Sequence, residues 1–225
     1  TWRDESADLL VMKSKTDDKH EGPTQVIDVW TAVGTAAPTL VTLDSTVAGT
    51  LPPTQRIVNF RRAAWMSGPA GAGQMIAVGV ADWPAKPAAP EGRGGNANGR
   101  GAGPAATTND KPDVDVWHWN DSIVMARQKL SLAADRRRSL PAVWHVSTNK
   151  LVVLGKSFDE TVSPIRGTAL ALVSEFTPYL MERSIGRGAA DIYLADLTTG
   201  ARTLLKKDVG SNASASTGGK YAIFA

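Results

Sequence analysis

Three consecutive arginines, Arg136, Arg137 and Arg138, are the residues of this chain whose type and spacing best suit contact with a ligand. A guanidinium group can hold a carboxylate through two parallel hydrogen bonds, so the run could bind a peptide carboxylate or an acidic patch on a partner. The other interpretation is a solvated bend between two strands, which is the usual role of a charge run in a turn. Replacement of all three arginines by alanine separates the two hypotheses.

A serine nucleophile is a second kind of functional residue that the sequence could contain. A serine hydrolase of the α/β class places its nucleophile in Gly-x-Ser-x-Gly, because small flanking residues allow the strained turn between strand and helix. The nearest match is the segment 155–159, G-K-S-F-D, which has Asp159 where the second glycine is needed. Ser157 is therefore interpreted as a loop serine, and no catalytic residue is predicted in this chain.

Metal and cofactor sites are not predicted either. The chain has no cysteine, which excludes thiolate ligands, and its histidines are His20, His118 and His145. They form neither H-x-H nor H-E-x-x-H, the spacings that place two ligands on one metal ion. Because His118 and His145 each follow a tryptophan in a predicted strand, we interpret them as structural residues, partly exposed opposite a buried tryptophan.

The composition excludes several classes of protein. With 225 residues, 42% of them apolar, the chain is long enough for one large domain with its own core. The net charge is only +3, and no stripe of basic residues alternates with aromatic ones, so a nucleic-acid partner is not predicted. There is no run of 18 apolar residues, so no membrane span is expected. The composition does not indicate a compartment.

Alternating apolar and polar residues predict β-strands along most of the chain. The clearest case is Asp191 to Leu197, which alternates and is followed by the turn sequence Thr198-Thr199-Gly200 and by a returning strand from Ala201. A second hairpin is predicted from Leu140 to Leu154. The stretch from Ser122 to Ala134 fits neither period cleanly. Because strands flank it, we predict a long strand there.

The segment 84–112 differs from the rest of the chain in composition. It is rich in glycine, alanine and proline and has no large apolar side chain. Such a segment cannot bury enough surface to offset the cost of ordering it, so we predict a flexible surface insertion. Strict alternation resumes after it, in a strand predicted from Asp113 to Trp119.

A turn followed by an apolar strand recurs along the chain, starting at Trp2, Trp65, Ser163 and Ser216. A loose period of roughly 50–70 residues without helices is typical of β-propeller blades. We therefore predict an all-β fold over residues 1–225, a partial β-propeller of about three four-stranded blades and the first strand of another. The predicted blades are 2–64, 65–162 and 163–215, with the next beginning at 216–225. A two-sheet sandwich is the competitor, but it gives no reason for the repeat.

Several motifs resemble known propellers. The segment 216–221, S-T-G-G-K-Y, is similar to the S-P-D-G-K-Y blade start of TolB-like and prolyl-oligopeptidase propellers, with Gly218 in place of the aspartate. The segment 191–200, D-I-Y-L-A-D-L-T-T-G, resembles their D-I-Y-x-x-D-x-x-T-G hairpin. The segments 111–119, 134–136 and 142–145 resemble the N-terminal propeller of bacterial S9 serine peptidases.

The resemblance implies a non-catalytic propeller portion of an S9-like serine peptidase, which caps the hydrolase active site and restricts entry to short peptides. The catalytic Ser, Asp and His would belong to an α/β-hydrolase domain that this chain lacks, and peptides would be the substrates. The alternative is a stand-alone TolB-like propeller that binds a protein partner. The reading frame beyond Ala225 separates the two. Because three blades cannot close a ring, we also expect self-association through open blade edges or a longer chain.

Overall fold

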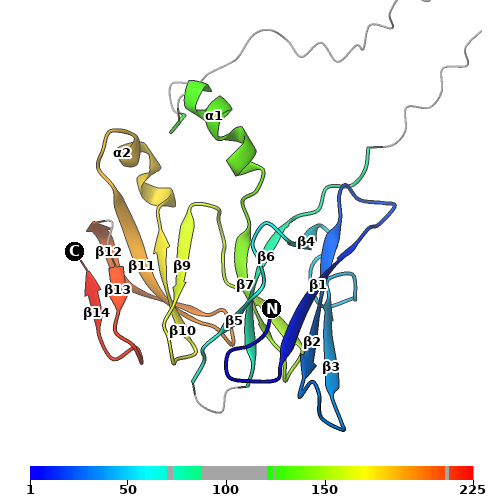
Figure 1. Ribbon diagram of the computed structural model, residues 1–225. Coiled ribbons are helices and arrows are strands. Elements are labelled where there is room, and N and C mark those ends of the chain that lie inside the picture. Colours follow the sequence, from blue (N-terminus) through cyan, green and yellow to red (C-terminus); the bar gives the residue numbers. More distant parts are fainter. Residues whose placement is uncertain (70–72, 88–120, 124, 211–212, 225) are drawn as a thin grey trace, which may run out of the picture.

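The computed structural model describes residues 1–69, 73–87, 121–123, 125–210 and 213–224 (Figure 1). These residues form a mostly β structure of four antiparallel sheets that follow one another along the chain, and none of these sheets is closed into a barrel. The all-β prediction is therefore confirmed.

The first sheet is three-stranded and antiparallel, with β2 in the centre. Its strands are β1 (Leu9–Lys15), β2 (Thr24–Thr31) and β3 (Thr39–Asp44). Successive side chains of a strand point to opposite faces, so Leu10, Ile27, Val29 and Leu43 share one buried face. That face is directed at the second sheet.

The second sheet has the strand order β4-β6-β7-β8, and β5 also pairs with β6. Its strands are β4 (Gln55–Val58), β5 (Ala64–Met66), β6 (Met75–Asp82), β7 (Leu140–His145) and β8 (Lys150–Val153). β4 pairs with the second half of β6 and β5 with the first half, so both lie along the same edge. The five residues 59–63 interrupt this edge strand.

The third sheet is four-stranded, in the order β12-β11-β10-β9, and the fourth is a two-stranded hairpin. Their strands are β9 (Glu160–Pro164), β10 (Leu170–Glu175), β11 (Ala189–Asp196), β12 (Arg202–Gly210), β13 (Ala213–Ala215) and β14 (Ala222–Phe224). A 3-10 turn (Thr177–Tyr179) and α2 (Leu180–Ser184) connect β10 to β11. The two hairpins predicted from sequence are confirmed as β7–β8 and β11–β12.

The sheets pack face to face in chain order (Figure 1). One cluster joins the first sheet to Ile76, Val78 and Trp144 of the second, and another joins Met75 and Val143 of the second to the third. A third cluster joins the third sheet to β13. Since side chains alternate along β6 and β7, the second sheet buries both of its faces.

The strand predicted from Ser122 to Ala134 is wrong, because Met125–Asp135 forms the helix α1. The sequence M-A-R-Q-K-L-S-L-A-A-D consists mainly of strong helix formers, and this propensity was a better guide than the flanking strands. α1 projects from the sheets (Figure 1), and Leu130 is 86% exposed. The expectation of a chain without helices is corrected by α1 and α2.

The sheets begin slightly earlier than the predicted repeat units. β4 precedes Trp65 yet belongs to the second sheet, β9 begins at Glu160, and β13 precedes Ser216. At the predicted insertion, residues 84–87 are described and contact the N-terminal part of the chain: Ala85 forms a β-bridge with His20. Residues 88–112 and the predicted strand at 113–119 lie outside the described residues.

Candidate functional site

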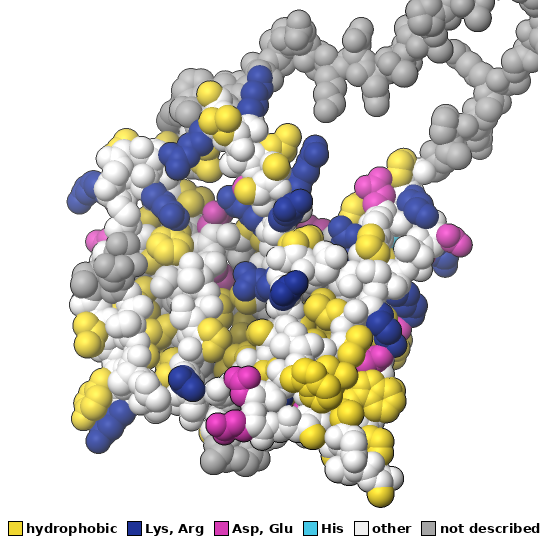
Figure 2. Space-filling model, viewed as in Figure 1, with side chains coloured by type: hydrophobic (Ala, Val, Ile, Leu, Met, Phe, Trp, Pro, Cys, Tyr) yellow, Lys and Arg dark blue, Asp and Glu magenta, His cyan; other side chains and the backbone are white. Residues whose placement is uncertain are grey.

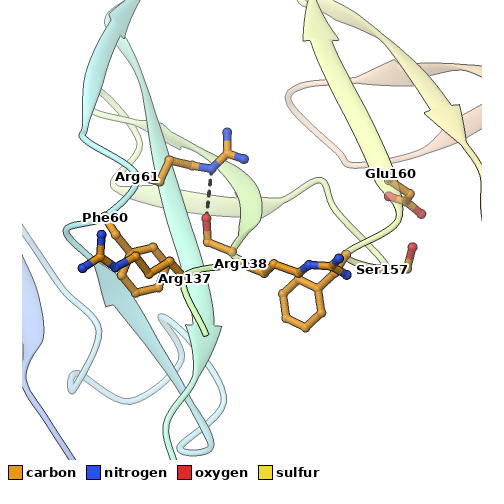
Figure 3. Close-up of a pocket in the computed structure, with 8 residues that line it drawn as sticks. Phe60, Arg61, Arg137, Arg138, Ser157 and Glu160 are labelled. Carbon is orange, nitrogen blue, oxygen red and sulfur yellow. Dashed lines mark hydrogen bonds between the residues drawn. The ribbon is translucent and has the colours of Figure 1, made fainter. Parts of the chain in front are cut away.

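A cavity of about 270 Å³ lies where loops of the second sheet meet the connection to the third (Figure 3). Its walls come from three separate segments: the interruption between β4 and β5, the end of the α1–β7 connection, and the β8–β9 connection. The lining residues are Phe60, Arg61, Arg137, Arg138, Ser139, Ser157, Phe158 and Glu160. Figure 2 shows Lys and Arg side chains gathered over α1 and along the middle of this face.

Arg61 is held in place by two features of the second sheet. Its side chain lies over Gly79 of β6, where an added Cβ would come within 2.6 Å of the Arg61 Cβ. Its Nε donates a hydrogen bond of 3.0 Å to Ser139 Oγ, drawn as the dashed line in Figure 3. Among the residues that the structure describes, no carboxylate pairs with Arg61. Its two terminal nitrogens therefore remain available to a ligand.

The three predicted arginines have three different environments. They follow α1, and their backbone N–H groups donate to carbonyl oxygens of the last turn, as in the hydrogen bond of 2.9 Å from Arg137 to Ala134. Arg138 pairs with Asp135 (Nε to Oδ1, 2.8 Å) and with Asp159 (3.5 Å). Arg137 lines the cavity and has no carboxylate partner in the described part of the chain. Arg136 does not line the cavity.

Glu160 forms one wall of the cavity, but its carboxylate is committed to a buried ion pair with Arg202 of β12. The two guanidinium–carboxylate distances are 3.0 and 2.7 Å, and the Glu160 side chain is 0% exposed. Arg202 also donates to the Leu154 carbonyl oxygen. Burial acts to raise the pKa of Glu160, but the hydrogen bonds from Arg202 and from the Lys156 N–H outweigh it and keep the pKa below its usual value.

Ser157 lies in the β8–β9 connection and is part of the local hydrogen-bonding of that loop. Its Oγ accepts a hydrogen bond of 3.2 Å from the Asp159 N–H and lies 3.3 Å from Thr177 Oγ1. The strand β9 follows it, where a nucleophile elbow would need a helix. No histidine lines the cavity. Glu160, the carboxylate in the cavity wall, is paired with Arg202 and is therefore not free to act as a base for this hydroxyl.

The described histidines are held by structural contacts. His145 on β7 is buried, with Nε2 2.9 Å from the Leu197 carbonyl oxygen across the contact between the second and third sheets. It was expected to be partly exposed, and the packing of the third sheet against β7 is the reason that it is not. His20 stacks on Trp83 with ring centroids 4.2 Å apart. His118 lies outside the described residues.

Sequence reasoning identified Arg137 and Arg138 but missed Arg61, Ser139 and the two phenylalanines that line the cavity. Arg61 lies 76 positions before Arg137 in the chain, and only the pairing of β6 with β7 brings the two segments together. The sequence did contain a comparable signal at Phe60-Arg61-Arg62, where two adjacent arginines follow an aromatic residue.

Comparison of the chain with protein-family models, with curated proteins and with solved structures gives no match. Within the described residues, no group of three His, Asp or Glu side chains is placed to hold a metal ion. In the same part of the chain, no helix combines the length and the apolar character needed to cross a bilayer.

Proposed function

We propose that the four sheets are successive blades of a β-propeller segment. The observation that carries this proposal is the packing of the second sheet, which buries one face against the first sheet and the other against the third. A two-sheet sandwich buries only one face of each sheet, whereas stacked blades bury both. The fourth sheet packs on the third through Ala213 and Ala215.

We further propose that this segment is a non-catalytic part of an S9-like serine peptidase. Its support is the resemblance of the motifs in the chain to that family, together with the hairpin that the 191–200 motif forms in the third sheet. Ser157, the serine nearest to the nucleophile motif, has no histidine beside it in the cavity. The role would be steric: a ring of blades over the hydrolase pocket admits short or unfolded peptides and excludes folded proteins.

The test uses the full product of the reading frame that contains this chain. A fluorophosphonate probe, which labels activated serines, should modify a Gly-x-Ser-x-Gly serine outside residues 1–225, and the protein should hydrolyse short peptides but leave folded proteins intact. Absence of a hydrolase domain from that reading frame would contradict the peptidase role. It would favour a TolB-like module that binds a protein partner.

A further inference from the structure

We propose that the cavity between the second and third sheets binds the carboxylate group of an extended peptide, through Arg61 and Arg137. The inference does not depend on the proposed peptidase role, because it concerns binding by residues of this chain alone. It also differs from the prediction made from sequence, since it keeps Arg137, drops Arg136 and Arg138 and adds Arg61.

The available hydrogen-bond donors support this assignment. Arg138 is paired with Asp135 and Asp159, so its charge is already compensated. Arg61 uses only Nε, in its bond to Ser139, and no carboxylate in the described residues pairs with Arg61 or Arg137. The terminal nitrogens of a guanidinium group match the two oxygens of a carboxylate in spacing and direction.

The Arg61 side chain is also held in place before a ligand binds. The stem of Arg61 packs over Gly79, and Ser139 fixes its Nε, so the side chain has already lost much of the freedom that binding would otherwise remove. Ser139 is anchored at the start of β7 in the second sheet, next to Leu140. Arg61 is thus held against the second sheet before a ligand binds.

The size and polarity of the cavity favour a peptide carboxylate. Sites for whole drug-sized ligands enclose about 300–1,000 Å³, whereas this cavity of about 270 Å³ suits one acidic side chain or a chain terminus. Phe60 and Phe158, 38% and 43% exposed, offer apolar surface beside the cations for the flanking part of a peptide.

The experiment is isothermal titration calorimetry of the chain with N-terminally acetylated tetrapeptides that differ only in charge. One pair contains glutamate or glutamine at the same position, a second pair ends in a free carboxylate or an amide, and inorganic phosphate is titrated separately. The Arg61→Met and Arg137→Met variants are compared with Arg62→Met and Arg136→Met, which remove neighbouring exposed arginines outside the cavity.

We expect the charged peptides to bind, and loss of either cavity arginine to weaken binding by about tenfold to a hundredfold. The two control variants should bind as the unaltered chain does. Arg61→Lys, which keeps the charge and the stem, should bind with intermediate affinity and guards against misfolding of Arg61→Met. Equal binding of charged and neutral peptides, or equal losses in the control variants, would overturn the proposal. So would binding of phosphate with no binding of the peptides.

Discussion

At the scale of single residues, the ion pair between Glu160 and Arg202 is the most consequential contact near the cavity. It joins β9 to β12 within the third sheet, and Arg202 extends it to the Leu154 carbonyl at the end of the second. Removal of one partner of a buried ion pair leaves an uncompensated charge and costs about 3–5 kcal/mol. Arg202→Met should therefore lower the free energy of unfolding by about that amount in urea denaturation.

The same ion pair predicts how stability depends on pH. The pKa of Glu160 is lowered in the folded chain, so the stability that its charge provides is complete above the ordinary pKa that this glutamate has in the unfolded chain. It is lost as the pH falls through the lower folded value. The Glu160→Gln variant should lack this part of the acid sensitivity, whereas Glu182→Gln, at an exposed position of α2, should retain it. Equal slopes in urea titrations between pH 5 and pH 3 would contradict this explanation.

Gly79 leaves the space in which the Arg61 side chain lies. An alanine Cβ there would come within 2.6 Å of the Arg61 Cβ and 3.0 Å of Ser139 Oγ, so Arg61 would have to move. We expect Gly79→Ala to lower the free energy of unfolding by about 1–3 kcal/mol, the usual cost of overpacking. It should also weaken carboxylate binding by the cavity. Gly188→Ala is the matched control for loss of a glycine, because no atom lies within 4 Å of its added Cβ and its φ is not positive.

Among the secondary-structure elements, α1 adds little to the hydrophobic core. Leu130 is 86% exposed, while Trp144 on β7 is fully buried between the first two sheets. Leu130→Gln should change the free energy of unfolding by less than about 0.5 kcal/mol, as expected for an exposed site. Trp144→Ala should cost about 3–5 kcal/mol. Thermal unfolding followed by circular dichroism compares the two, and a large loss in Leu130→Gln would mean that α1 packs on the sheets in solution.

At the scale of the whole molecule, the stack of sheets has apolar groups at its C-terminal end. Tyr221 and Ile223, on or beside β14, are 64% and 69% exposed, and β14 pairs only with β13 among the described strands. An exposed apolar edge strand is a template for pairing with another chain. We therefore expect concentration-dependent association of the isolated chain, detected by light scattering.

A charged residue on β14 tests whether this exposed strand causes the association. Ile223→Lys should reduce association, because a lysine on an edge strand opposes pairing with a second strand. Leu130→Lys, which places the same charge on the exposed helix α1, serves as the matched control and should leave association unchanged. A monodisperse monomer before any substitution would contradict the expectation.

Most strands and the two tight hairpins could be predicted from sequence, because alternation and turn residues such as Gly200, with φ of +76°, act over neighbouring positions; the exception is α1, where a strand was predicted. The sequence also singled out the arginine run. Tertiary structure alone decided which arginine is free, because Asp135 and Asp159 compensate Arg138, whereas Arg137 has no such partner in the described residues. Arg61 joined the site only through the pairing of β6 with β7, a long-range contact that no local pattern encodes.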